Sequence, residues 1–168
     1  RVKKFYTKGG LDAVLNEIEQ LKSDYVQSIY YTATLQLDGL SNADVQGVLE
    51  HAGDELSSSY EQSKLLRNNS DKFSDSQANM NAALKYVEGI SSSYEQSKIY
   101  IHFLTKEDLS EANKSMIIKG VREISSTYEQ SKVLLAILKD DLSDTNIELV
   151  IAEIPNISSS YEQSKVLS

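Results

Sequence analysis

Four copies of the segment Tyr-Glu-Gln-Ser-Lys each place a lysine four residues after a tyrosine. The tyrosines and the lysines that follow them are Tyr60 and Lys64, Tyr94 and Lys98, Tyr128 and Lys132, and Tyr161 and Lys165. A lysine beside a phenol can lower the pKa of the hydroxyl, so that the hydroxyl passes a proton at neutral pH. Taken alone, each pair could therefore act in proton transfer.

The rest of the chain does not supply what such proton-transfer chemistry needs. Tyr-x-x-x-Lys resembles the catalytic pair of short-chain dehydrogenases, which works beside a dinucleotide bound at a glycine-rich loop after a strand. The seven glycines here are scattered, strand-like alternation is nearly absent, and one active site has no use for four pairs. His51 and His102 fall in different helices and no cysteine is present, which disfavours a metal site. We therefore expect no enzyme activity, no cofactor and no metal.

The tyrosines recur at steps of 34, 34 and 33 residues. Each lies in a ten-residue motif, at residues 56–65, 90–99, 124–133 and 157–166, and a worn fifth copy with Tyr25 occupies residues 21–29. A fixed period of this size is typical of stacked structural repeats. We expect an entry segment at residues 1–10 that ends in a Gly9-Gly10 turn, followed by one helical-repeat domain at residues 11–168. Its repeats are expected at residues 11–39, 40–73, 74–108, 109–141 and 142–168.

Each repeat opens with apolar residues at the spacing of one helix face. The first set is Leu11, Val14, Leu15, Ile18 and Leu21, and the later sets begin at Val45, Met80, Met116 and Ile147. The spacing predicts one amphipathic helix per repeat, called here the A helix. Ser41, Ser110 and Ser143 are expected as N-caps, and Pro155 is expected to end the last A helix.

The ten-residue motif predicts a hinge after the A helix and the start of a second helix, called here the B helix. Its second serine stands three residues before a glutamate, in the pairs Ser58 and Glu61, Ser92 and Glu95, Ser126 and Glu129, and Ser159 and Glu162. In a capping box of this spacing the hydroxyl accepts from the glutamate amide, and the carboxylate reaches back to the serine amide. Gly53 and Gly89 are expected in the left-handed conformation that closes a helix. The motif tyrosine is expected to fill the wedge between the two helices, with its hydroxyl bound to the backbone.

The B helix is apolar on nearly all sides where it is best developed, as at residues 133–138. A helix of this kind must be covered on several sides, and stacked helix pairs provide that cover. Two repeats depart from the rule. In the second repeat residues 67–72 are polar, so its B helix is expected to be short or frayed. In the fifth the sequence stops early in the B helix, and an apolar stacking face is expected to lie bare there.

Charge and hydropathy limit the partners of this chain. It has 17 Lys and Arg against 25 Asp and Glu, a formal net charge of −8, which disfavours nucleic acid. The basic cluster in the first eight residues could contact lipid or nucleic acid, but stable anchoring usually takes about 4–8 clustered charges, so we favour a solvated entry segment. No apolar run is long enough to span a bilayer, and no signal segment is visible. The start at Arg1 fits a piece of a longer precursor.

A unit of about 34 residues with two helices has the size of a tetratricopeptide repeat, although the consensus positions of that repeat do not align. The Ser-Asp-Tyr form at residues 23–25 and the later Ser-Ser-Tyr forms resemble a helical repeat of predicted bacterial envelope proteins. The resemblance covers about residues 11–168. It implies a right-handed α-solenoid of the tetratricopeptide or HEAT-like class, hints at the bacterial periplasm or cell surface, and implies no substrate.

Part of the motif has no role inside a single repeat. The residues concerned, which stacking would arrange in parallel rows, are Gln62, Lys64, Gln96, Lys98, Gln130 and Lys132, with Gln163 and Lys165 in the last copy. The rows could grip an extended partner, could join one repeat to the next, or could reflect recent duplication. We favour the last two explanations over the first. The candidate partner-binding residues are the glutamines and lysines of the first three complete copies, together with Arg67, Asn68 and Asn69, where the repeat pattern fails.

The sequence thus predicts an all-α protein, a right-handed α-solenoid of about five antiparallel helix pairs. Its expected function is non-catalytic: a scaffold that binds a protein or peptide along a concave surface lined by A helices. The acidic balance favours a basic or neutral partner. The alternative is a structural spacer or self-assembly module of a larger bacterial envelope protein, which associates end to end through the bare apolar face.

Overall fold

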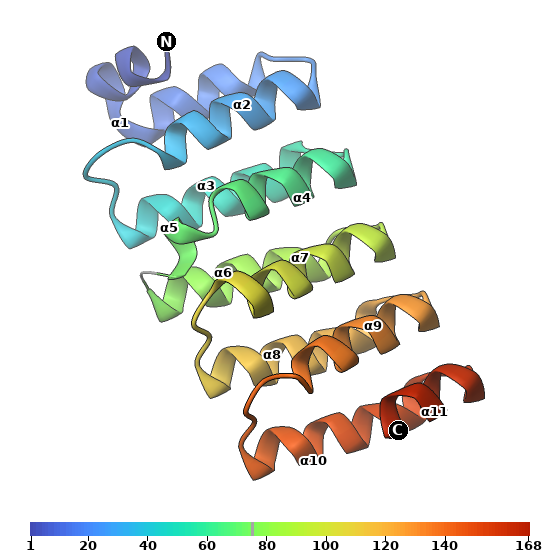
Figure 1. Cartoon of the computed structure of the whole chain (residues 1–168). Helices are drawn as coiled ribbons and strands as arrows, with labels where there is room; N and C mark the ends of the chain where they lie inside the picture. The colour runs from blue at the N-terminus through green and yellow to red at the C-terminus, as the bar shows by residue number, and fades with distance from the viewer. Residues whose placement is uncertain (75) are drawn as a thin grey trace. The chain divides into compact units, whose positions relative to one another are not determined.

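The computed structural model describes residues 1–74 and 76–168, and every regular element in these two stretches is a helix. The all-α class predicted from the spacing of apolar residues is therefore confirmed. The chain divides into two compact units, Arg1–Gly89 and Ile90–Ser168. Figure 1 shows the helices of both units in chain order.

The first unit contains six helices in its described residues. They are α1 (Val2–Glu19), α2 (Asp24–Leu35), α3 (Asn42–Glu55), α4 (Ser59–Asn68), α5 (Asp71–Ser74) and α6 (Gln77–Glu88). The B helix α2 packs against α1, α3 and α4, and the A helix α3 packs against α1 and α6. Ile18, Tyr31, Val48, Leu66 and Leu84 are fully buried in this unit, which places its apolar core between the A and B helices.

Helix α1 is broken at Gly9-Gly10, as the sequence predicts. Gly9 has φ −157° and ψ 27°, and Gly10 has φ 66° and ψ −156°. A positive φ is open to glycine at no steric penalty, whereas a side chain would clash with the backbone. The two glycines therefore separate the entry segment from the first A helix, which begins at Leu11.

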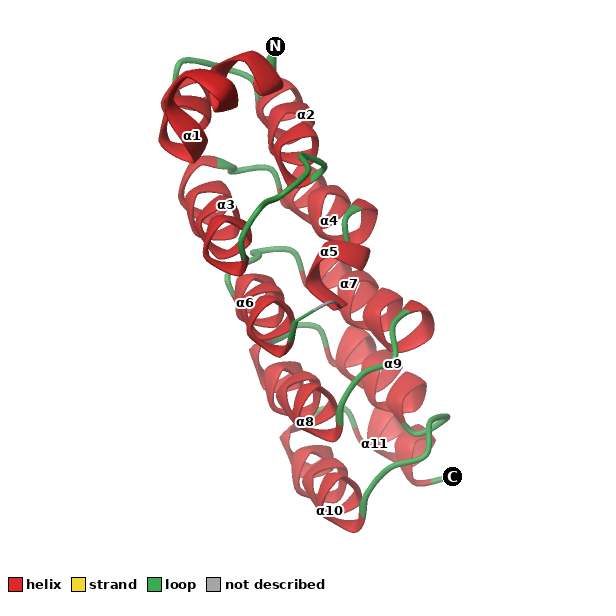
Figure 2. Ribbon diagram, turned by 90° about the vertical axis from the view of Figure 1, so that its left-hand side faces the viewer, coloured by secondary structure: helices red, strands yellow, loops and turns green. Residues whose placement is uncertain are grey.

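The second unit contains five α-helices and two short 3₁₀ helices. They are α7 (Ser93–Lys106), α8 (Glu111–Gly120), η1 (Val121–Glu123), α9 (Thr127–Ile137), α10 (Asp144–Glu153), η2 (Ile154–Asn156) and α11 (Ser160–Leu167). The B helices α7, α9 and α11 lie side by side in one layer, and the A helices α8 and α10 lie in a second layer (Figure 2). Pro155 lies in η2, so α10 ends before it as predicted.

Two glycines do not adopt the predicted conformation. Gly89 follows α6 with φ −78° and ψ −10°, which is right-handed, and Gly53 lies inside α3. The expectation of left-handed closure was therefore wrong. Helix α3 continues to Glu55 and ends in the extended residue Leu56 (φ −83°, ψ 118°), whose side chain is buried. An extended exit into the hinge needs no left-handed residue.

The B helix of the second repeat is short, and buried residues follow it. Helix α4 ends at Asn68, and the chain then forms α5, in which Phe73 is fully buried. Asn69 is also fully buried. Its amide nitrogen donates to the Leu65 carbonyl at 2.8 Å, and its oxygen accepts from Gln36 at 3.0 Å. The expectation of a short B helix is confirmed, and buried hydrogen bonds satisfy the asparagine that follows it.

Helices α7 and α8 approach closely where Tyr100 of α7 lies against Gly120 of α8. A Cβ atom at Gly120 would overlap the hydroxyl of Tyr100, a ring that is almost fully buried and cannot move aside. Gly120→Ala should therefore lower the free energy of unfolding by about 1–3 kcal/mol, as overpacking does. Chemical denaturation measures the change.

Gly53→Ala is the matched control. Its Cβ would meet the Tyr86 ring at 3.5 Å, an ordinary contact, and alanine is favoured over glycine inside a helix. The control should leave the protein as stable or make it more stable. Equal loss in both variants would contradict this account of Gly120.

Candidate functional site

The motif serines cap the B helices as the sequence predicts. The hydroxyls accept from the amides of the glutamates three residues later at 3.3–3.4 Å, with Ser58, Ser92, Ser126 and Ser159 as the caps. The complete capping box forms in α3, where the Asp44 carboxylate returns to the Ser41 amide at 2.9 Å. For the motif glutamates that return contact was expected and is wrong. The carboxylates of Glu61, Glu129 and Glu162 accept from another donor.

The preceding repeat already occupies the hinge amides, which belong to the two serines before each B helix. The carboxylate of Asp24 accepts from Ser57 N at 3.0 Å and from Ser58 N at 2.6 Å. In unit 2 the hydroxyl of Ser93 accepts in the same way from the two hinge amides before α9, at 3.1 and 3.3 Å. Asp24 and Ser93, which precede Tyr25 and Tyr94, thus bind the amides of the next hinge. These amides are therefore not available to the motif glutamate of that hinge.

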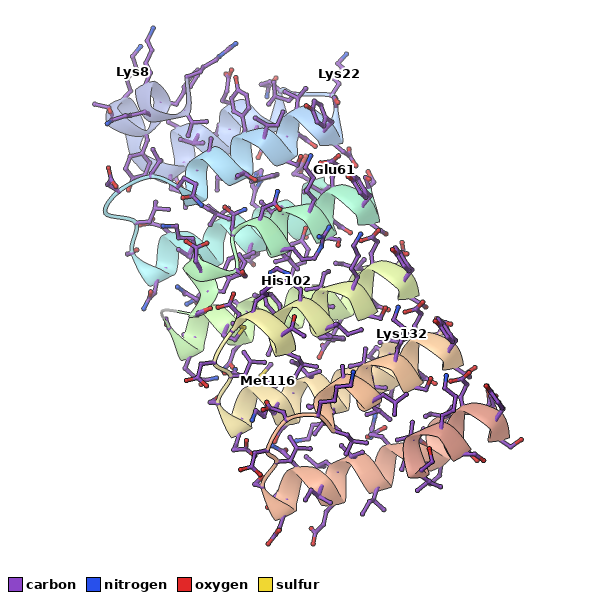
Figure 3. All side chains as sticks on the ribbon, in the orientation of Figure 1. Lys8, Lys22, Glu61, His102, Met116 and Lys132 are labelled. Atoms are coloured by element: carbon purple, nitrogen blue, oxygen red, sulfur yellow. The ribbon has the colours of Figure 1, made fainter. Side chains whose placement is uncertain are left out.

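Three of the motif glutamates, Glu61, Glu129 and Glu162, each accept a hydrogen bond from a motif serine of the preceding repeat. These serine–glutamate bonds join Ser28 to Glu61 within unit 1, and Ser97 to Glu129 and Ser131 to Glu162 within unit 2. The Ser28 bond is 2.5 Å long, and Figure 3 shows Glu61 near the start of α4. All three glutamates are only 7% exposed. A hydrogen bond to a charged group contributes about 1.5–3 kcal/mol, so these bonds are a major link between repeats.

The motif lysine supplies the countercharge for the buried glutamate on its own helix. The Nζ–Oε2 distances are 3.5 Å for Lys64–Glu61, 3.7 Å for Lys98–Glu95, 2.9 Å for Lys132–Glu129 and 3.0 Å for Lys165–Glu162. The Ser131 hydroxyl and then the Lys165 ammonium hold the pKa of Glu162 below its ordinary value. Glu162 in turn raises the pKa of Lys165. The carboxylate therefore stays ionised at neutral pH, with both a donor and a countercharge.

The motif tyrosine lies on the surface, contrary to the wedge position expected from the sequence. Tyr25, Tyr60, Tyr94 and Tyr128 are 53–57% exposed, and Tyr161 is 71% exposed. The buried position of the hinge belongs to the first motif residue, which is Leu56, Ile124 or Ile157. An aliphatic side chain has no polar atom to satisfy, so it fits this buried position better than a phenol does.

The exposed rings and the lysines alternate along one edge of each unit. The ammonium groups lie 5.0–5.7 Å from ring centres, with Lys64 over Tyr25, Lys98 over Tyr94, Lys132 over Tyr94 and Tyr128, and Lys165 over Tyr128 and Tyr161. Figure 3 shows Lys132 at this edge, near the start of α9. Such cation–π contacts contribute about 0.5–1 kcal/mol at exposed sites. The contacts agree with the alternative in which the lysine row joins repeats, and its contact with a partner stays a prediction.

The motif glutamines bind the hinge of their own repeat. Their side-chain amides donate to backbone carbonyls, from Gln62 to Leu56 at 2.6 Å, from Gln130 to Val121 at 3.4 Å and from Gln163 to Ile157 at 2.7 Å. Gln62, Gln96 and Gln130 are only 3–8% exposed. Gln62, Gln130 and Gln163 thus bind backbone carbonyls at the ends of their A helices, and the three glutamines that precede Gln163 expose little surface to a partner.

The predicted residues outside the motif are spread over different environments. The Arg67 guanidinium donates from Nε to the Ser63 hydroxyl at 3.2 Å and is half-buried. Asn68 is exposed, whereas Asn69 is buried and hydrogen-bonded as described above. The structure therefore leaves Asn68 and part of Arg67 on the surface, and these three residues do not converge on a common pocket.

Buried asparagines link neighbouring A helices within each unit and were missed by the sequence analysis. Asn146 donates to the carbonyl and the carboxylate of Glu111 at 3.0 and 2.9 Å, and its oxygen accepts from Ser115 at 2.5 Å. Asn79 donates to Asn42 in unit 1 at 3.0 Å. With the Ser143 hydroxyl first among its donors, the pKa of Glu111 falls to about 2. The signal was available in the spacing Ser-x-x-Asn, which ends at residues 79, 113 and 146.

A groove between α3 and α6 is the candidate binding site, called here the α3–α6 groove. It has a volume of about 480 Å³ and is lined by Glu50 and Asp54 of α3, by Lys85 and Tyr86 of α6, and by Gln62. The two carboxylates and Lys85 are exposed. Tyr86 donates its hydroxyl to the Ala52 carbonyl at 3.2 Å, and burial raises the pKa of this hydroxyl. Tyr86 therefore offers a fixed ring, and the carboxylates offer negative charge.

Tyr31, His51 and Glu19 connect three helices of unit 1. The Tyr31 hydroxyl lies 2.6 Å from His51 Nδ1, and His51 Nε2 lies 3.2 Å from Glu19. Burial raises the pKa of the fully buried Tyr31, so this hydroxyl stays protonated. Within residues 1–74 and 76–168, no three His, Cys, Asp or Glu side chains gather as a metal ion would require. We interpret the three residues as a polar joint of α1, α2 and α3.

Comparison of the chain with protein-family models, with curated proteins and with solved structures finds no match. The resemblance to helical repeats of envelope proteins therefore stays an expectation. Among the helices that the structure describes, none combines the length and the apolar character that crossing a bilayer takes. The function must be argued from the geometry of the site.

The serine–glutamate bonds generate the second prediction. Ser131 is fully buried and donates to Glu162, so Ser131→Ala leaves a buried carboxylate without that donor. The free energy of unfolding should fall by about 1–3 kcal/mol. Denaturant titration followed by circular dichroism measures this change.

Ser164→Ala is the matched control at the same motif position. Ser164 is exposed and donates to the Ser160 carbonyl of its own helix. Its removal should change stability by less than about 0.5 kcal/mol, as surface substitutions do. If both variants lower the free energy of unfolding by the same amount, the motif serine does not stabilise the protein through its bond to the next repeat.

Proposed function

We propose that this protein is a non-catalytic scaffold, a right-handed α-solenoid of about five helix pairs that binds an extended peptide of a partner along its A helices. The single observation that supports this function is the α3–α6 groove, which lies between two A helices of successive repeats. Peptides commonly lie along the surfaces that repeated helices create. The motif edge is a poorer candidate, since most of its polar groups already bind each other.

The charge of the α3–α6 groove favours a peptide with basic side chains. Glu50 and Asp54 stand one helical turn apart on α3, and both are exposed. Together they can bind a lysine or an arginine of the peptide. Lys85 on the opposite wall can bind a backbone carbonyl or a carboxylate of the same peptide. The formal net charge of −8 adds long-range attraction for a basic segment.

The apolar part of the groove supplies the remaining contact area. Tyr86 is held by its bond to Ala52, so its ring is fixed before a partner binds. A fixed aromatic ring loses little conformational entropy on binding, which is why tyrosine is enriched at interfaces. An open groove of about 480 Å³ suits a few consecutive side chains of an extended segment.

The second candidate function is a spacer or assembly module of a larger envelope protein. It is favoured by the apolar residues on the outer face of α10 and α11, where Ile147, Ile151 and Leu167 are exposed. A location in the bacterial periplasm or at the cell surface belongs to this proposal, because it depends on the resemblance of the repeat motif.

Peptide selection tests the proposed binding site. A library of ten-residue peptides is screened against the protein, and the affinity of the selected peptides is measured by fluorescence anisotropy. The selected peptides should contain lysine or arginine. The double variant Glu50→Lys and Asp54→Lys should weaken their binding by about tenfold or more, because it removes two exposed charge pairs of about 0.2–1 kcal/mol each and adds two repelling charges.

The control reverses an exposed charge elsewhere. Glu148→Lys lies on α10 in unit 2 and should leave peptide binding unchanged. Failure to select any peptide, or equal affinity of the wild type and the double variant, would refute the α3–α6 groove as the binding site.

A further inference from the structure

The outer face of α10 and α11 exposes positions that are buried in the preceding repeat. Ile151 is 58% exposed, whereas Ile118 at the same position of α8 is fully buried. Leu167 is 69% exposed, whereas Leu134 at the same position of α9 is fully buried. The motif serine shows the same change, from buried Ser131 to exposed Ser164 in α11. Both repeats therefore have similar residues at these positions. In the preceding repeat the positions are buried by other helices, and in the last repeat they are exposed.

The structure shows what covers these positions in the preceding repeat. Helix α10 packs against α8, and α11 packs against α9. The α11 helix brings Glu162, which accepts from Ser131, and Lys165, which lies 5.5 Å from the ring centre of Tyr128. Helices α10 and α11 thus cover the preceding repeat with apolar residues, with a carboxylate that accepts from its serine, and with an ammonium group near its tyrosine ring.

The last repeat has the serine, the tyrosine and the apolar positions that α10 and α11 contact in the preceding repeat. The Ser164 hydroxyl turns back to the Ser160 carbonyl at 2.9 Å, in place of a carboxylate on a following helix. Tyr161 is 71% exposed, more than the other motif tyrosines. Ile147 is exposed at the position where α8 has the buried Lys114. An apolar face with a serine donor and a tyrosine ring is ready for a helix pair that has the motif glutamate and lysine.

The first repeat of a second copy does not meet these requirements. After Tyr25 the motif positions of the glutamate and the lysine hold Val26 and Ile29. A valine offers no acceptor to Ser164, and an isoleucine offers no charge to Tyr161. Ser164 would keep only the Ser160 carbonyl as its acceptor, and the charge-assisted bond that Ser131 makes to Glu162 would have no counterpart. End-to-end stacking of copies of this chain would therefore lack both the serine–glutamate bond and the tyrosine–lysine contact.

We propose that the α10–α11 face is a docking site for a helix pair of the same repeat type, and that recognition depends on a Tyr-Glu-x-x-Lys segment in the incoming B helix. Its glutamate accepts from Ser164, its lysine lies over Tyr161, and its apolar residues cover Ile151 and Leu167. This face is separate from the α3–α6 groove, so its role stands or falls independently of peptide binding.

An extended chain tests this proposal. A second copy of residues 136–168 is appended after Ser168, which continues the step of 33 residues from Tyr128 to Tyr161. Hydrogen exchange of the α11 amides is then compared with that of the original chain. The appended pair should slow exchange in α11 by about tenfold or more, because covered helices open less often. Ile151→Lys in the extended chain should remove this protection.

The control differs from the extended chain in two side chains. In the appended copy alone, the residues that match Glu162 and Lys165 are changed to valine and isoleucine, as in the first repeat. The gain in protection should fall below about threefold. Unchanged α11 exchange in the extended chain, or equal protection by the control, overturns the proposal. So does a concentration-dependent dimer of the original chain that Ile151→Lys abolishes, since a second copy would then be the occupant.

Discussion

A buried hydrogen bond between a serine of one repeat and a glutamate of the next is the interaction on which each unit depends. A carboxylate out of water is stable only with hydrogen-bond donors and a nearby positive charge. Ser131 and Lys165 supply both to Glu162, and Ser97 and Lys132 supply both to Glu129. The serine, the glutamate and the lysine therefore act together, and this requirement explains why they recur at fixed positions.

The motif is best understood as a connector between repeats. Its leading aliphatic residue fills the hinge, its second serine caps the B helix, and its glutamine closes the hinge from inside. The residue before the tyrosine binds the amides of the next hinge, and the tyrosine ring makes a cation–π contact with the lysine of the next repeat. Because these motif residues already bind within the protein, our proposal places partner binding on the A helices, at the α3–α6 groove.

The sequence predicted what depends on one repeat alone. Helix class, the break at Gly9-Gly10 and the serine caps follow from local spacing, and the structure confirms them. The capping role of Glu61 and the buried position of Tyr60 failed, because a neighbouring repeat claims the hinge amides and an aliphatic residue fills the hinge. The α3–α6 groove could not be predicted, since it depends on side chains from two repeats whose relative position no local pattern specifies.

A double-mutant cycle on the Ser97–Glu129 pair tests the connector most directly. The free energies of unfolding of the wild type, Ser97→Ala, Glu129→Gln and the double variant are compared. The bond between these residues predicts a coupling energy of about 1–3 kcal/mol. Additive effects, with coupling below roughly 0.5 kcal/mol, would show that the serine and the glutamate do not stabilise the repeats through each other.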